Sequence, residues 1–267
     1  MLKKLVTLDV VDIIGQTLQE QGWFIDERTG KYSCEGRVFH NPDKPWIYVN
    51  PEPGTPCSVY QVIVDKCNFI PKHCLSCWKV VVKPRTLYEL MRVLKLQEDW
   101  TQGYLGKGRF CKCGIELRTW VPQLYGAYFY TRSKGQGLAR WEEVRKMVDA
   151  INPNIPVILK RYCTEFELRL GPSDQYRPPA HAEALEREIW GALDIEPLVR
   201  TVSLQPAYLR GHVIRKWIEW AWSAGDETAM AFNDGEPLYT PSVTYHPGDG
   251  SGDKAETKGK GATDGKS

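Results

Sequence analysis

The chain has 267 residues, of which 42% are hydrophobic and 25% charged, a composition typical of a soluble globular protein. Eight cysteines are too few for a disulfide scaffold, and the sequence has no run of about 18 apolar residues that would predict a membrane-spanning helix. The formal net charge of +2 hides an asymmetry: Lys and Arg outnumber Asp and Glu by eight over residues 78–170, whereas acids are in excess by six elsewhere. This excess predicts either an anionic partner for the basic region or a solvated, Lys-rich surface.

The N-terminus begins with two lysines and an apolar stretch, but Asp9 and Asp12 interrupt that stretch. A secretory signal is therefore not expected. We expect a cytoplasmic protein that does not associate with membranes, in a reducing setting where clustered cysteines bind metal more often than they form disulfides.

Residues 1–73 are expected to form a helix and strand segment packed on the core. Apolar residues at three- and four-residue spacing predict an amphipathic helix over residues 5–21. A hairpin is predicted around Gly30, a short strand at Trp46–Val49, and a further strand at Val59–Cys67.

Residues 74–170 contain the same pattern twice, a strand, a helix and a strand. The predicted elements are strands at Trp78–Pro84, Cys111–Trp120, Tyr125–Ser133 and Pro156–Leu170, and helices at Thr86–Trp100 and Gly137–Ile151. The order β-α-β-β-α-β predicts an α+β, ferredoxin-like (split βαβ) core, because each crossover returns its strand to the same sheet.

Residues 171–245 are expected to be a C-terminal helical extension, with helices at Ala180–Leu193 and Ala207–Asp226. Ile214, Trp217, Ile218 and Ala221 share one face of the second helix, which favours packing on the sheet, with a protein partner for these helices as the alternative. Residues 246–267 have no apolar anchor, and we expect them to be a disordered tail.

Two close pairs of cysteines flank the first two predicted strands of the core. Cys74 and Cys77 precede the first strand, and Cys111 and Cys113 begin the second. Four thiolates are a ligand set for tetrahedral Zn²⁺, and because no coordination position would stay open, the predicted zinc site is structural.

Other roles for the cysteines stay open at this stage. Cys67 and His73 are reserve ligands, and a Cys67, Cys74 and Cys77 set leaves an iron–sulfur cluster as an alternative to zinc. The four zinc candidates could also be buried free thiols, as we expect for Cys34, Cys57 and Cys163.

Alternation along the four strands of the core predicts a sheet face that is both basic and aromatic. Placing the apolar side chains against the helices leaves Lys79, Lys83, Lys112, Arg118, Tyr128, Tyr130, Arg132, Lys160 and Tyr162 on the other face. Cations neutralise phosphates and aromatic rings stack on bases, so this set predicts binding of single-stranded nucleic acid. The alternative is that the flanking segments cover the tyrosines.

The segment Gly126–Arg132 resembles the aromatic strand of RNA-recognition domains, without their leading basic residue and with shifted spacing. This resemblance implies the same use of the sheet face, as a platform for a nucleic-acid strand.

Two other classes of function are carried as alternatives. A metal-dependent nuclease or nucleotidyl-transfer enzyme would use Glu116, Glu165 and Glu167, although alternation puts Glu116 and Glu165 on opposite faces if residues 156–170 are one strand. An assembly or host-partner-binding protein would use the tryptophan-rich C-terminal helices.

Overall fold

The computed structural model describes residues 2–20, 22–33, 44–52, 57–105, 107–193 and 204–236. Its elements in chain order are α1 (Leu2–Glu20), β1 (Phe24–Ile25), β2 (Tyr32–Ser33), β3 (Trp46–Asn50), α2 (Cys57–Cys67), α3 (Lys72–Leu75), β4 (Trp78–Val82), α4 (Leu87–Trp100), β5 (Cys111–Ile115), β6 (Tyr125–Thr131), α5 (Lys134–Asp149), β7 (Val157–Arg161), α6 (Thr164–Leu170), α7 (Ala182–Leu193), α8 (Ala207–Ser223) and the 3-10 helix η1 (Glu227–Phe232). The expected tail, 246–267, and Cys34 lie outside the described residues.

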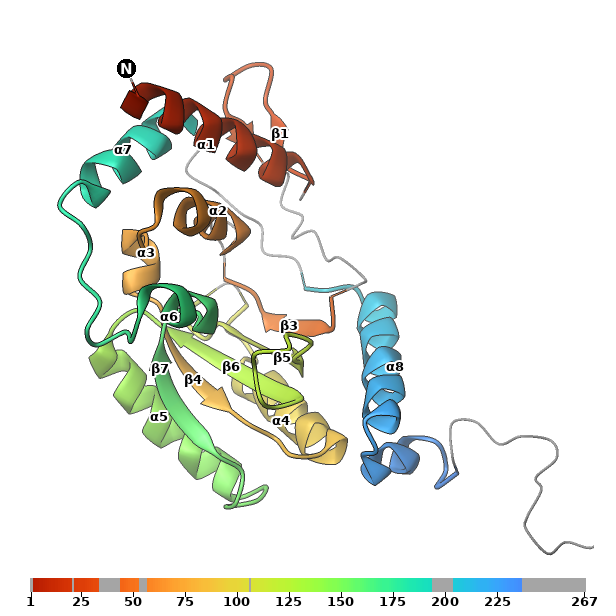
Figure 1. Ribbon diagram of the computed structural model, residues 1–267. Coiled ribbons are helices and arrows are strands. Elements are labelled where there is room, and N and C mark those ends of the chain that lie inside the picture. The colour runs from red at the N-terminus through yellow and green to blue at the C-terminus, as the bar shows by residue number, and fades with distance from the viewer. Residues whose placement is uncertain are drawn as a thin grey trace, which may run out of the picture.

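One antiparallel sheet of five strands, in the order β3-β5-β6-β4-β7, forms the centre of the molecule (Figure 1). Val80 in the middle of β4 pairs with Phe129 of β6 on one side and with Leu159 of β7 on the other. The α+β class is confirmed, as are the hairpin around Gly30 and the strand that begins at Trp46. That strand, β3, joins the sheet beside β5.

Helices α4 and α5 cover one face of this sheet, and each begins at a capping residue. The hydroxyl oxygens of Thr86 and Ser133 accept hydrogen bonds from the backbone N–H groups of Glu89 and Gln136, both at 3.2 Å. Such caps satisfy donors that the first turn of a helix leaves unpaired.

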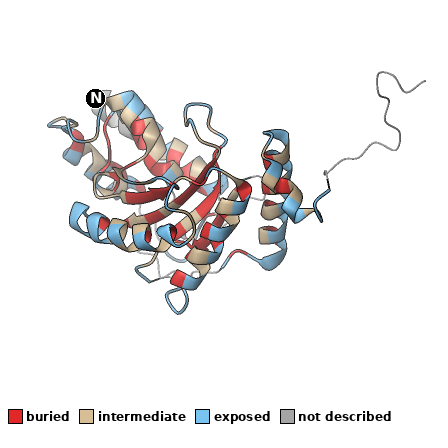
Figure 2. Ribbon diagram, turned by 90° about the horizontal axis from the view of Figure 1, so that it is seen from below, coloured by how far each residue is buried: buried red, intermediate tan, exposed pale blue. Residues whose placement is uncertain are grey.

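The main hydrophobic core lies between the sheet and these two helices. Val80, Val82, Ala127 and Phe129 point into it, as their alternation along β4 and β6 predicts. Burial is therefore concentrated in the strands and on the inner faces of the helices, whose outer faces are exposed (Figure 2).

The opposite face of the sheet is partly covered at the end where β4 begins, by α2, α3 and α6 (Figure 1). Tyr60 and Val64 of α2 and Phe166 of α6 are buried there with Tyr162. Helices α1 and α7 form a further layer, in which Ile14 and Ile189 share a second cluster with Ile63 of α2. None of the described helices has the length and apolar character needed to span a membrane.

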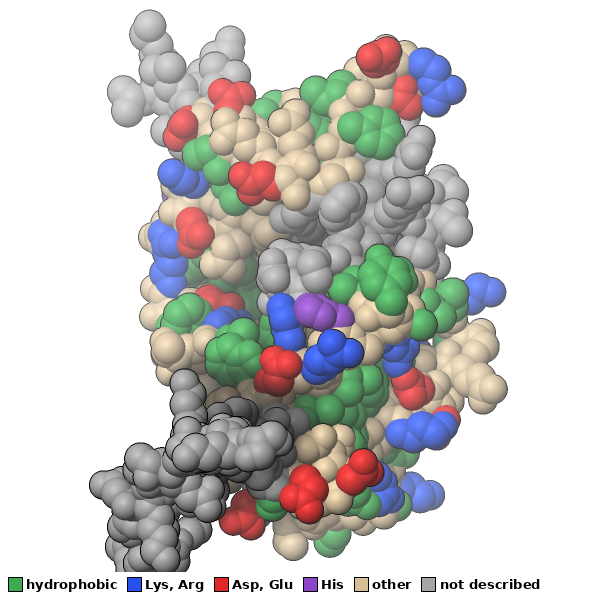
Figure 3. All heavy atoms as spheres, turned by 90° about the vertical axis from the view of Figure 1, so that its right-hand side faces the viewer, with side chains coloured by type: hydrophobic (Ala, Val, Ile, Leu, Met, Phe, Trp, Pro, Cys, Tyr) green, Lys and Arg blue, Asp and Glu red, His purple; other side chains and the backbone are tan. Residues whose placement is uncertain are grey.

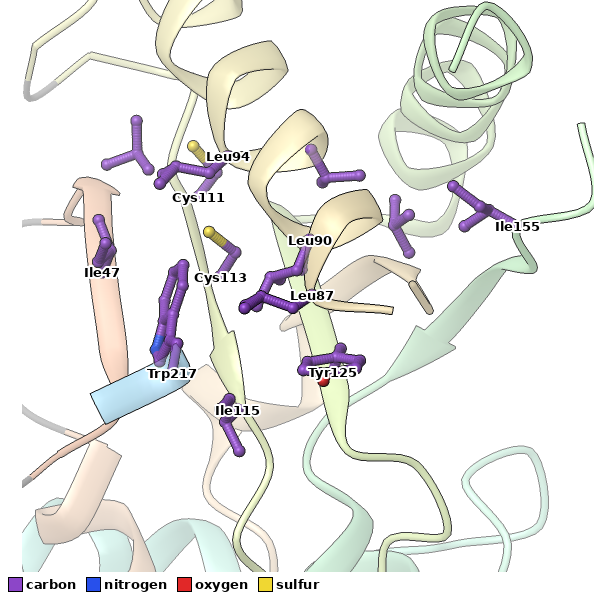
Figure 4. Close-up of a cluster of buried hydrophobic side chains, with 14 of the residues drawn as sticks. Ile47, Leu87, Leu90, Leu94, Cys111, Cys113, Ile115, Tyr125, Ile155 and Trp217 are labelled. Atoms are coloured by element: carbon purple, nitrogen blue, oxygen red, sulfur yellow. The ribbon is translucent and has the colours of Figure 1, made fainter. Parts of the chain in front are cut away.

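Helix α8 packs beside β3 and α4 and completes the main core, which confirms the predicted apolar face around Trp217. The Trp217 side chain is fully buried, and its indole N–H donates to the carbonyl of Pro45 at 2.8 Å. Figure 4 shows the Trp217 ring between Ile47 and Cys113. The C-terminal helix is therefore part of the same core as the sheet.

The predicted strand at Val59–Cys67 is wrong, because these residues belong to helix α2. Val59, Tyr60, Ile63 and Val64 are its buried residues, a spacing that lies on one face of a helix. Four β-branched residues in this short run suggested a strand, but burial against α1 and α6 favours the helix.

The predicted strand at Pro156–Leu170 is correct only in its first half. Strand β7 ends at Arg161, Tyr162 has a positive φ of 33°, and α6 begins at Thr164. Glu165 and Glu167 are therefore on a helix, and their predicted strand positions are wrong. Strand β5 is also shorter than predicted and ends at Ile115, so Arg118 lies in the following loop.

The carboxylate of Asp226 joins the C-terminal region to the core. It accepts hydrogen bonds from the backbone N–H of Leu87 at 2.6 Å, from the Tyr125 hydroxyl at 2.5 Å, and from the N–H and hydroxyl of Thr228 at 3.0 and 2.7 Å. Although burial opposes the charge, these hydrogen bonds outweigh it and lower the pKa of Asp226 below its usual value.

We expect Asp226→Ala to lower the free energy of unfolding at pH 7 by about 1–3 kcal/mol, because several donors lose a charged acceptor. Because the pKa of Asp226 is lower in the folded protein, its ionised carboxylate stabilises the fold at any pH above the unfolded-state pKa, near 4. This stabilisation is lost as the pH falls through the folded-state pKa. The difference in free energy of unfolding between Asp226→Ala and the unchanged protein, measured by urea titration, should therefore shrink below about pH 4. The exposed Asp174→Ala is the control, and a deficit independent of pH would contradict this role.

Candidate nucleic-acid interface

The sheet face opposite α4 and α5 presents basic and aromatic side chains, as the alternation predicts. Lys79 of β4, Lys112 of β5, Tyr128 and Tyr130 of β6, and Lys160 of β7 all have strand neighbours that point into the main core. These five side chains therefore lie on the predicted face of the sheet.

A pocket of about 170 Å³ opens on this face. The sheet side of the pocket is lined by Lys79 and Val81 of β4, Lys83 just after β4, Tyr128 of β6, and Ile158 and Lys160 of β7. The loop after β5 lines one part of the pocket with Arg118, Val121, Pro122 and Gln123, and the start of α6 lines another with Cys163 and Thr164. Four of these twelve side chains are cationic, so the pocket suits an anion.

Lys79 is the most buried cation of the pocket, with 7% of its surface exposed. Its Nζ donates to Cys163 Sγ at 3.1 Å and lies 5.9 Å from the centre of the Tyr130 ring. Among the described residues, no carboxylate lies within ion-pair distance of Lys79.

The other three cations differ in how far carboxylates neutralise them. Lys160 donates to the Thr164 hydroxyl at 2.7 Å and lies 3.7 Å from a carboxylate oxygen of Glu167. Burial, and then the charge of Lys79, lower the pKa of Lys160. Lys83 has no carboxylate within ion-pair distance in the part of the chain that the structure describes. Lys79 and Lys83 are therefore the two cations of the pocket that no carboxylate of the described residues pairs directly.

Arg118 bridges two of the three carboxylates considered for catalysis. Its Nε donates to Glu116 at 2.6 Å, and its terminal nitrogens contact Glu116 and Glu165. Burial raises the pKa of Glu165, but a backbone hydrogen bond and Arg118 outweigh it, so the pKa is lowered. Glu165 reaches this face because it is on α6. The two acids thus neutralise Arg118, while Glu167 lies apart beside Lys160.

Lys112 and the two tyrosines form a packed aromatic group, which leaves little open ring surface. Lys112 Nζ lies 4.3 Å from the centre of the Trp46 ring and 5.6 Å from those of Tyr48 and Tyr128. The Tyr128 and Tyr130 rings are stacked with centres 6.5 Å apart. Cation–π contacts of this kind stabilise the sheet edge, and only Tyr128 of this group also lines the pocket.

Besides Lys112 and Tyr130, two further side chains of the predicted set, Arg132 and Tyr162, do not line the pocket. Arg132 pairs with Glu52, and its guanidinium is 3.1 Å from His73 Nε2, near α3. Tyr162 is fully buried in the cluster of α2, α3 and α6. A nucleic-acid strand cannot stack on Tyr162, which we remove from the candidate set.

The four predicted zinc ligands lie in separate parts of the molecule. Cys111 and Cys113 point into the main core, where Figure 4 shows their sulfurs beside Leu94 and Leu90, and Cys74 is buried in the cluster of α2, α3 and α6. Burial raises the pKa of Cys111 to about 12 and that of Cys77 to about 11.

The structure gives the zinc expectation no support. Within the described ranges, no three His, Cys, Asp or Glu side chains are grouped so that they could hold a metal ion. The thiols expected to be buried also differ, because Cys57 is exposed and Cys163 is only partly buried.

One exposed aromatic residue beside the pocket was not singled out from the sequence. Trp120 has 50% of its surface exposed and lies in the loop that contributes Arg118, Val121 and Pro122 to the pocket. The signal available in the sequence was a tryptophan between a basic residue and a proline, at a point where the strand pattern stops.

On the side of the molecule that carries α8, Lys and Arg side chains are interspersed with acidic and hydrophobic ones (Figure 3). Comparisons with family models, curated proteins and solved structures found no match for this chain. Function is therefore inferred from the pocket and its surroundings.

Proposed function

We propose that this protein binds single-stranded nucleic acid at the sheet face opposite α4 and α5, within a ferredoxin-like unit formed by residues 74–170. The observation that carries the proposal is the pocket lined by Lys79, Lys83, Lys160 and Arg118, one side of which is formed by the loop that also carries the exposed Trp120. Cations neutralise phosphates, and an accessible ring provides a surface on which a base stacks.

The strand order supports the ferredoxin-like assignment. In the unit β4-α4-β5-β6-α5-β7, the first and third strands, β4 and β6, are central, and the second and fourth, β5 and β7, flank them. The two crossover helices cover one face, so a ligand would bind on the part of the other face that α2, α3 and α6 leave uncovered. Since folds of this kind serve many functions, the proposal depends on the side chains of the pocket.

The structure changes which aromatic residue is expected to stack on a base. Tyr128 and Tyr130 are held by each other, by Lys79 and by Lys112. The Trp120 ring is half exposed and has the surface that a base needs. We therefore assign stacking to Trp120 and phosphate binding to the lysines of the pocket.

Titration of labelled single-stranded DNA and RNA at several salt concentrations tests the proposal. Trp120→Ala should weaken binding by about 1–3 kcal/mol with little change in the salt dependence, because it removes stacking. Lys83→Ala should instead make the slope of log K against log salt shallower by about 0.7, because one phosphate contact is lost.

Two residues far from the pocket provide matched controls. Trp220 on α8 is exposed to a similar extent as Trp120, at 47% against 50%, and Lys146 is an exposed lysine on α5. Trp220→Ala and Lys146→Ala should bind as the unchanged protein does. Absence of binding to DNA and RNA at low salt would overturn the proposal, as would equal losses in the control variants.

A further inference from the structure

The pocket holds cations that no carboxylate of the described residues pairs directly. Two of its four cations, Lys79 and Lys83, have no carboxylate within ion-pair distance among the described residues, and Lys160 is 3.7 Å from Glu167. An internal phosphodiester carries one negative charge, whereas a phosphate monoester carries about 1.5–2 at pH 7. Two cations without a directly paired carboxylate can each pair with one charge of the monoester.

The size of the pocket suits a phosphate group. A cavity of about 150 Å³ holds benzene, whose six heavy atoms are close in number to the five of a phosphate group. The volume here is about 170 Å³, and the loop after β5 and the start of α6 both line it beside the sheet.

Lys79 gives independent support, because only 7% of its surface is exposed. A buried ammonium is costly unless it is paired with a counter-charge. Its only hydrogen-bond partner among the described residues is the sulfur of Cys163, which is a weak acceptor. A doubly charged phosphate within the pocket would supply the missing acceptor.

We propose that the pocket binds the terminal phosphate monoester of a nucleic-acid strand, with Lys79, Lys83 and Lys160 as its ligands. This inference rests on the proposed function and specifies which part of the strand occupies the pocket. Thr164, whose hydroxyl holds Lys160, positions that lysine at the start of α6.

The test compares three versions of one labelled oligonucleotide, with a 5′-phosphate, with a 3′-phosphate and with hydroxyls at both ends. One phosphorylated version should bind about tenfold more tightly than the hydroxyl version, because a dianion makes additional charge-assisted hydrogen bonds. The version that binds more tightly identifies the end of the strand that is recognised. Inorganic phosphate at millimolar concentration should remove this preference.

Two variants locate the effect. Lys83→Met should reduce the preference for the phosphorylated strand severalfold, whereas Lys146→Met on α5 should leave it unchanged. Equal affinity for all three strands would overturn the terminal-phosphate inference and leave strand binding intact. Absence of binding to every strand would overturn the proposed function itself. A preference that persists in Lys83→Met and in Lys79→Met would place the phosphate elsewhere and overturn the inference as well.

Discussion

Replacing Trp217 by alanine is expected to lower the free energy of unfolding by about 3–5 kcal/mol, the range for a large aromatic side chain removed from a core. The side chain is fully buried between the sheet and α8, and its loss also leaves the carbonyl of Pro45 without a donor. Urea unfolding followed by circular dichroism measures the change.

Trp220 on the same helix is the matched control, because 47% of its surface is exposed. Trp220→Ala should change the free energy of unfolding by no more than about 0.5 kcal/mol. Equal destabilisation by the two substitutions would contradict the packing of α8 through Trp217.

Lys79→Met is expected to change stability and binding in opposite directions. Burial of a lone ammonium is unfavourable, and Met fills a similar volume without charge, so the free energy of unfolding should rise by about 1–4 kcal/mol. Binding of a phosphorylated strand should weaken by about 2–5 kcal/mol, because the phosphate loses a buried, hydrogen-bonded charge. Thermal unfolding and strand titration measure the two effects.

The opposite signs distinguish a ligand-binding lysine from a structural one. If Lys79 were only structural, its replacement would lower the stability of the protein, and binding would fall only as far as the folded fraction falls. Lys146→Met, at an exposed position on α5, should leave both quantities unchanged. Loss of stability in Lys79→Met at unchanged binding would contradict a ligand role.

The sheet and the direction of its side chains were predictable because a strand has a period of two. Val80 and Val82 had to point away from Lys79, whichever strands became neighbours. The same rule assigned Tyr128 and Lys160 to the face that holds the pocket. Local pattern was sufficient for these features.

Two elements could not be predicted because tertiary contacts decide them. The run from Val59 to Val64 fits a buried strand and a helix face, and only the surrounding helices select the helix. The end of β7 depends on Tyr162, a residue type that rarely adopts a positive φ. Without that turn, Glu165 could not be placed beside Arg118.

The candidate site was predicted only in part, for the same reason. The strand lysines follow from alternation, but Trp120 and Cys163 belong to connections whose paths the sequence pattern does not specify. The zinc hypothesis assumed that spacing along the chain brings Cys77 and Cys113 together. In the fold, Cys113 points to the α4 side of the sheet, into a core that does not contain Cys77.

The late position of α8 and Asp226 in the chain has a consequence for synthesis. Trp217 closes the core over Ile47 and Cys113, and Asp226 accepts from the backbone of Leu87, 139 residues earlier. During translation the sheet emerges from the ribosome well before the segment that seals it. Until residue 226 is free, the nascent chain exposes apolar surface beside β3, so we expect this stage to be the one at which chaperones bind.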